Sequence, residues 1–284
     1  MNIAEWNVRH DLLGFETEIK QMLFDKNISV MFFTETDSES IRGNFNIKDY
    51  DTFYPANDNV RVVGIARKEP GVQFKMRDDL MSSRFASIWI ECITTTSKKF
   101  LICGCYREWT VDGDDSINGQ KERLNIFIDQ INRACEENEK VLILGDMNLC
   151  LKKWNEKEFR YKSLSEPLRS NLTINNLNIA DLGYTYFSDH ADFNGDFASS
   201  ELDHVYFSNT CSVTSKTLPK AGTDHLPILA RLELSQKRTM YISHVTKRSF
   251  KRFNIEHFKV DLANCKWVSL IECTDVSDAA NLYD

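Results

Sequence analysis

Short runs of β-branched and aromatic residues recur along the first 235 residues and predict a domain rich in strands. Turn-forming or polar residues bound most of these runs. The predicted strands are residues 2–8, 29–35, 52–54, 60–68, 84–95, 99–107, 140–146, 202–207, 211–218 and 226–234. Several strands follow one another between residues 52 and 107 without a helical pattern between them, which does not fit a regular βαβ repeat.

Apolar residues at helical spacing predict two longer helices, over residues 11–26 and 119–138. A third, weaker pattern predicts a helix that begins at Pro167, because proline suits the first helical position, and ends at about residue 176. Strands outnumber helices and occur in mixed order. We therefore expect an α+β fold in which two packed sheets carry helices on their outer faces.

The composition changes after residue 235, which predicts a domain over 1–235 and a separate tail over 236–284. The tail is basic at first and then reads as an amphipathic, helix-prone segment over 255–284. Its early basic residues are Lys237, Arg238, Lys247, Arg248, Lys251 and Arg252. An ordinary amphipathic terminal helix is the alternative interpretation of this tail.

The overall composition is that of a folded protein without a membrane-spanning segment, since 42% of the 284 residues are hydrophobic and no long apolar run occurs. The eight cysteines form no CxxC pair, and the first residues do not resemble a secretory signal, so we expect reduced, buried thiols and an intracellular location. The net charge of −7 argues against tight, non-specific binding to DNA. It does not exclude a metal-dependent nuclease, whose site must contain carboxylates.

Polar side chains stand at the ends of six apolar runs, where a turn residue is the ordinary explanation for each one taken singly. They are Asn7, Glu35, Tyr106, Asp146 with Asn148, Asp203, and Asp224 with His225. Strand ends of a sandwich can meet at one rim, so the whole set could form a single cluster. Such a cluster suits phosphodiester hydrolysis. Carboxylates hold a hard cation, an aspartate activates water, and a histidine held by an aspartate stabilises negative charge.

The ordered motifs WNV, TET, CYRE, GDMN, SELDHVY and TDHLP resemble those of the endonuclease/exonuclease/phosphatase superfamily, over residues 2–234. That resemblance implies a four-layer α/β/β/α sandwich of two mixed sheets flanked by helices. It also implies a bound Mg²⁺, with Mn²⁺ as the alternative, held by Glu35 together with Asn7 and Asp224. Two departures stand beside these motifs: His10 follows Arg9 where glycine is common, and Thr223 replaces the usual serine.

The same resemblance implies roles for the remaining site residues. Asp146, with Asn148 beside it, would position or deprotonate the attacking water. His225 would stabilise the transition state while Asp203 orients its ring. The residues implied to contact the substrate phosphate are Tyr106, Ser200 and Asn148.

Within the superfamily, the stretch GCYREWT and the later GDMNLCLKKWN with Tyr161 are similar to endonucleases of non-LTR (LINE-like) retrotransposons. The tail resembles the linker to a reverse transcriptase. The resemblance implies an endonuclease that nicks DNA in the nucleus and leaves a 3′-hydroxyl for target-primed reverse transcription, with the reverse transcriptase region of the same polyprotein as partner and no membrane association.

Two alternatives stay open: a phosphoesterase acting on a phosphoinositide or nucleotide, and a copy that binds DNA without cutting it. A basic rim including Arg61, Arg84, Arg107 and Lys152 would favour nucleic acid as the substrate.

Overall fold

The computed structural model describes residues 1–37, 44–55, 60–95, 98–156, 160–191, 195–233 and 254–264. The chain forms two units, Met1–Ser235 and Gln236–Asp284. In the second unit, helix α5 spans Ile255–Asn264, so the helix-prone tail is helical at its start, and the rest of it lies outside the described residues. The predicted basic stretch from Lys237 to Arg252 also lies outside them. Among the described helices, none is both long and apolar enough to span a membrane.

Two six-stranded mixed sheets form the first unit. The first sheet has the order β13 (Ser212–Thr217), β14 (Ile228–Glu233), β1 (Asn2–Asn7), β2 (Val30–Thr34), β4 (Val62–Arg67) and β3 (Tyr50–Phe53). The second has the order β5 (Val72–Met76), β6 (Ala86–Thr94), β7 (Lys99–Tyr106), β8 (Val141–Asp146), β12 (Asp203–Ser208) and β9 (Leu177–Ile179). Strands β10 (Tyr186–Ala191) and β11 (Phe197–Ser200) form a separate antiparallel pair.

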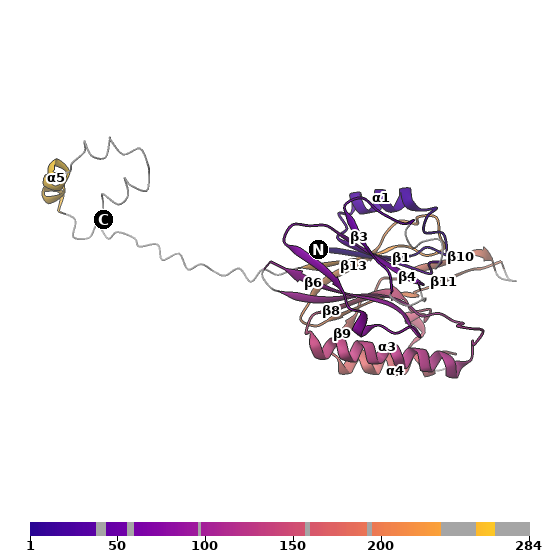
Figure 1. Cartoon of the computed structure of the whole chain (residues 1–284). Coiled ribbons are helices and arrows are strands. Elements are labelled where there is room, and N and C mark those ends of the chain that lie inside the picture. Colours follow the sequence, from indigo (N-terminus) through magenta and orange to yellow (C-terminus); the bar gives the residue numbers. More distant parts are fainter. Residues whose placement is uncertain are drawn as a thin grey trace. The chain divides into compact units, whose positions relative to one another are not determined.

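Helices cover the outer faces of both sheets, and the predicted four-layer α/β/β/α sandwich is confirmed (Figure 1). Helix α1 (Glu16–Asp25) packs on the first sheet, and α3 (Ile117–Glu137) and α4 (Lys162–Ile174) pack on the second. Short 3-10 turns, η1 (Asp78–Leu80) and η2 (Leu151–Lys153), join these elements. Three buried apolar clusters result: one between the sheets and one under each helical layer.

Alternation along β1 decides which side chains enter the space between the sheets. Ile3 joins the cluster between the sheets, whereas Ala4 and Trp6 join the cluster under α1. Because side chains of a strand alternate between faces, Glu5 and Asn7 share the inner face with Ile3. Both polar residues are fully buried. The first strand therefore places a carboxyl and an amide inside the sandwich at its end.

The sheets approach closely where β7 carries Gly104. A Cβ atom at this position would lie 2.2 Å from the ring of Phe32 on β2, which is far too close for any side chain. Glycine is therefore required here by packing between the sheets. The contact lies two residues before Tyr106 and fixes the end of β7 against the first sheet.

Two details of the predicted elements were wrong. Helix α4 begins at Lys162, so Pro167 lies inside it and not at its first position. The buried residues Leu164, Leu168 and Leu172 recur every four residues, and this apolar stripe starts before the proline. Helix α1 begins at Glu16, five residues later than predicted.

Four strands were missed: β5, β9, β10 and β11. Strands β10 and β11 are mostly exposed on both faces, so they carry no buried alternation that a sequence pattern could reveal. The described cysteines form no disulfide, and four of the six are buried, whereas Cys135 and Cys211 are half-buried. Cys103 and Cys105 are buried in one cluster, on the same face of β7.

Candidate active site

The polar strand ends meet at one rim of the sandwich because of the strand register. In the first sheet, the parallel strands β1 and β2 place Asn7 opposite Thr34, the residue before Glu35. In the second sheet, Asp146 at the end of β8 stands opposite both Tyr106 on β7 and Asp203 on β12. Chain segments that are far apart in sequence thus bring their polar residues together, as predicted from the strand ends.

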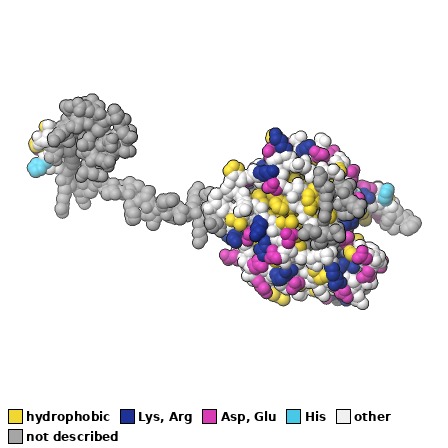
Figure 2. All heavy atoms as spheres, in the orientation of Figure 1, with side chains coloured by type: hydrophobic (Ala, Val, Ile, Leu, Met, Phe, Trp, Pro, Cys, Tyr) yellow, Lys and Arg dark blue, Asp and Glu magenta, His cyan; other side chains and the backbone are white. Residues whose placement is uncertain are grey.

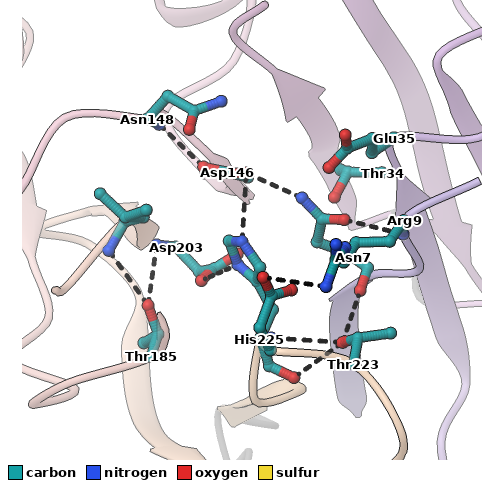
Figure 3. Close-up of polar contacts among 12 residues, drawn as sticks. Asn7, Arg9, Thr34, Glu35, Asp146, Asn148, Thr185, Asp203, Thr223 and His225 are labelled. Atoms are coloured by element: carbon teal, nitrogen blue, oxygen red, sulfur yellow. Dashed lines mark hydrogen bonds and ion pairs between the residues drawn. The ribbon is translucent and has the colours of Figure 1, made fainter. Parts of the chain in front are cut away.

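Asp146 is held on two sides by hydrogen bonds (Figure 3). Its Oδ2 accepts from Asn7 Nδ2 at 2.9 Å, and its Oδ1 accepts from the backbone N–H of Asn148 at 2.8 Å. Burial and the nearby Asp203 carboxylate raise the pKa of Asp146 to about 7, although His225 and the two hydrogen bonds oppose the rise. A carboxylate with a pKa near neutrality is well suited to take a proton from water.

His225 and Asp203 form a buried pair beside Asp146. Asp203 Oδ2 lies 2.9 Å from His225 Nδ1, and His225 Nε2 lies 4.0 Å from Asp146 Oδ2 (Figure 3). Burial alone would lower the pKa of His225, but the Asp203 carboxylate outweighs it, so the pKa rises to about 10. The ring is therefore an imidazolium at neutral pH, oriented by Asp203 and directed toward Asp146.

Backbone and hydroxyl contacts fix this pair in place. Thr185 Oγ1 accepts hydrogen bonds from the backbone N–H groups of Leu202 and Asp203, both at 3.1 Å. Thr223 Oγ1 accepts from His225 N at 3.2 Å and from Trp6 Nε1 at 3.0 Å. The Thr223 that departs from the usual serine thus supplies the hydroxyl that ties the His225 loop to β1.

We expect the His225 ring to stay protonated at pH 8 in metal-free protein, with a transition near pH 10, because Asp203 stabilises the charged form. Replacing Asp203 with asparagine should move this transition to a clearly lower pH. Burial lowers the pKa of His225, and the Asp203 charge that raises it is then absent. NMR titration of the histidine ring protons measures both values, with His225→Gln identifying the resonance. A wild-type transition near pH 6.5 that is unchanged in Asp203→Asn would contradict this geometry.

The predicted metal ligands border the same rim and offer oxygen atoms. Among the described residues, Asp224 Oδ1 is a buried oxygen with no hydrogen-bond partner, while its Oδ2 lies 3.2 Å from Arg9 Nη1. The backbone of Glu35 is in the left-handed region, with φ of 56°. The backbone N–H of His10 donates a hydrogen bond to the Glu35 carbonyl at 2.8 Å and holds it in this conformation. Its Oε1 lies 3.3 Å from His10 Nε2. Glu35, Asn7 and Asp224 thus offer the carboxylate and amide oxygens that a hard divalent cation prefers.

Asp146, Asp203 and His225 also place one potential ligand atom each within 4.8 Å of one another. Their arrangement favours proton transfer over metal binding, because His225 Nδ1 already engages Asp203 and the raised pKa keeps the ring protonated. An imidazolium has no free lone pair for a metal. We therefore keep Glu35, Asn7 and Asp224 as the predicted ligands.

The predicted phosphate contacts are less closely assembled. Tyr106 is buried at the end of β7, and burial, followed by the charges of Asp146 and Glu35, raises its pKa, so its hydroxyl stays protonated. The side chain of Asn148 donates to the Arg107 carbonyl at 3.0 Å. Ser200 lies on β11 opposite Tyr186, whose ring centroid is 5.1 Å from that of His225. The roles of these residues toward phosphate stay predictions.

Glu5 is a site residue that the sequence argument missed. It is fully buried on β1, and its Oε1 accepts from Thr34 Oγ1 at 2.7 Å. Burial and the carboxylates of Asp203 and Asp146 raise its pKa well above the ordinary value. Glu5 is an acidic residue on the same face of β1 as the apolar Ile3, and this placement was the signal that could have identified it.

Arg107 was predicted to belong to a basic rim beside the site. This prediction was wrong, because the side chain is buried and only 1% exposed. Its guanidinium donates to the carbonyls of Met147 and Asn148 and to Gln120 Oε1 on α3. Arg107 therefore holds the loop that follows Asp146. Of the other predicted rim residues, Arg84 and Lys152 are exposed and Arg61 is half-buried. On the face in Figure 2, basic and acidic side chains of the first unit are interspersed.

A family described as endonuclease-reverse transcriptase matches residues 100–229. Among solved structures, the endonuclease domain of TRAS1, a telomere-specific non-LTR retrotransposon, has a TM-score of 0.62 at 14% identity, covering 83% of this chain and 99% of that domain. No curated protein matches this chain in sequence.

Two further structures share the fold at lower TM-scores. TDP2 from D. rerio, complexed with a single-stranded DNA product, has a TM-score of 0.54 at 14% identity over 81% of this chain and 97% of that one. A 3′-5′ exonuclease from Neisseria meningitidis has a TM-score of 0.56 at 15% identity, over 82% and 99%.

The fold is that of the endonuclease/exonuclease/phosphatase superfamily. The resemblance to the endonuclease domains of non-LTR retrotransposons is confirmed by the family match and by the TRAS1 likeness.

Proposed function

We propose that this chain is a metal-dependent endonuclease that hydrolyses one strand of DNA and leaves a 3′-hydroxyl for target-primed reverse transcription. The observation that carries the proposal is the buried constellation of Asp146, Asp203 and His225, with a near-neutral pKa on Asp146 and a protonated ring beside it. A partner reverse transcriptase region on the same polyprotein and a nuclear site of action belong to this proposal. The family match and the TRAS1 likeness support it.

Each residue has a part in the hydrolysis. Ionised Asp146 takes the proton from the attacking water, while Asn7 and the N–H of Asn148 hold its two oxygens. The His225 imidazolium stabilises negative charge that develops on the phosphate, and Asp203 keeps the ring oriented. Mg²⁺ or Mn²⁺ at Glu35, Asn7 and Asp224 would neutralise phosphate oxygens.

The deciding experiment is plasmid nicking. Purified protein with Mg²⁺ should convert supercoiled plasmid into the open circle, and excess EDTA should abolish the conversion because the predicted oxygen ligands then hold no cation. Inositol phosphates and nucleotides added in excess should not be hydrolysed in the same reaction. No conversion with Mg²⁺ or Mn²⁺, or hydrolysis of the small phosphoesters alone, would refute the proposal in favour of the alternative substrates. Tight plasmid binding without cutting would favour the inactive-copy alternative.

A further inference from the structure

Trp109 is an exposed aromatic residue beside Arg107, which holds the loop that follows Asp146. It is 36% exposed, whereas Trp6, Trp89 and Trp154 are at most 6% exposed. It follows Tyr106, the end of β7, by three residues. The intervening Arg107 donates its backbone N–H to the Asp146 carbonyl at 2.9 Å. Trp109 is therefore tied through the backbone to the strand end that carries the proposed base.

Three neighbours hold Trp109 in one position. The Arg107 guanidinium carbon lies over its ring, 4.9 Å from the centroid. Tyr161 contacts it edge-on with ring centroids 4.7 Å apart, and Arg123 Nη2 donates to its carbonyl at 3.1 Å. An exposed tryptophan that is already held in this way loses little conformational entropy when a ligand binds to it. The indole is thus an apolar surface prepared before any ligand arrives.

The charges around this surface suit a nucleic-acid strand. Arg107 under the indole is buried and fully engaged by Met147, Asn148 and Gln120, so it polarises the ring without contacting solvent. Arg160 lies over the Tyr161 ring at 5.3 Å and is exposed beside it. An aromatic plane with an adjacent exposed cation is the arrangement that stacks a base and contacts its phosphate.

We propose that Trp109, with Tyr161 beside it, is a stacking platform for one unpaired nucleobase of the DNA strand, next to the scissile phosphate. The inference rests on the proposed nicking function and names a base-binding subsite within it. Stacking there requires the base to leave its pair, and this favours sites where the duplex opens easily. The platform is a binding element, and the proton chemistry remains with Asp146 and His225.

The test compares two single-stranded probes in EDTA: a 12-nucleotide oligothymidylate and a backbone of equal length with abasic residues throughout. Wild-type protein should bind the oligothymidylate with a change in tryptophan fluorescence that Trp109→Phe removes. Trp109→Ala should weaken oligothymidylate binding by roughly tenfold, because stacking one base contributes on this scale. It should leave binding of the abasic strand unchanged. Trp109→Phe should restore most of the affinity.

The control is Phe24→Ala, which truncates another aromatic side chain, 84% exposed on α1, and should alter neither probe. Equal losses for both probes in Trp109→Ala, or no loss for either, would overturn the platform. In both cases wild-type plasmid nicking would show that the proposed function survives. A wild-type protein that binds neither probe and nicks no plasmid would overturn both. Circular dichroism of Trp109→Ala and Trp109→Phe checks that each variant is folded.

Discussion

Replacing Asp146 with asparagine should lower the rate of plasmid nicking by about a thousandfold or more, within the range expected when a general base is lost. Asparagine keeps the size of the side chain and can still accept from the N–H of Asn148, but it cannot take a proton from water. The loss should appear in kcat with little effect on DNA binding. Single-turnover nicking with Mg²⁺ in excess measures it directly.

The same variant should be at least as stable as the wild type. The pKa of Asp146 is raised by folding to about 7, so its ionisation costs stability as the pH rises through that value. At pH 8, in metal-free protein, Asp146→Asn should therefore melt at an equal or higher temperature. Asp129→Asn, an identical change on the exposed surface of α3, should leave both nicking and melting unchanged. An Asp146→Asn protein that nicks like the wild type would remove Asp146 from the mechanism.

Replacing His225 with alanine should reduce nicking by roughly a hundred- to thousandfold, the scale of losing one preorganised group that stabilises the transition state. Asp203→Asn should also reduce nicking, because Asp203 holds and charges the ring. The double variant should therefore lose less activity than the two single losses combined, since residues acting as one unit are not additive. Rate measurements on the two single variants and the double variant test this coupling.

His257→Ala provides the matched control, since this exposed histidine lies on α5 in the second unit. It should nick at the wild-type rate. Fully additive losses for His225→Ala and Asp203→Asn would mean that Asp203 acts by another route, and the assigned pair would be wrong.

Much of this site was predictable because polar residues interrupt apolar strands at their ends. Asn7, Asp146 and His225 each stand at such a position, and strand ends meet at one rim whenever two sheets stack. Glu5 escaped prediction because a buried acid inside a strand looks like an ordinary exposed position until the inner face of β1 is known. Its raised pKa depends on burial and on the charges of Asp203 and Asp146, which lie far away in sequence.

Arg107 shows a second limit of the sequence. An arginine after a strand is usually solvated, and only the fold supplies the carbonyls of Met147 and Asn148 and the Gln120 side chain that bury it. Strands β10 and β11 were missed for a related reason, because an exposed hairpin has no apolar face to set a period. Non-local contacts, and not local propensity, decide both features.

The chemistry of the cut end is the most direct test of the central claim. Plasmid is first treated with the wild-type protein and Mg²⁺, or in parallel with the Asp146→Asn variant and Mg²⁺. Each product is then incubated with a DNA polymerase and labelled deoxynucleotides. We expect label on the open circles formed by the wild type, without prior phosphatase treatment, and none with Asp146→Asn. Open circles that accept label only after removal of a 3′-phosphate, or equal labelling by the two proteins, would contradict it.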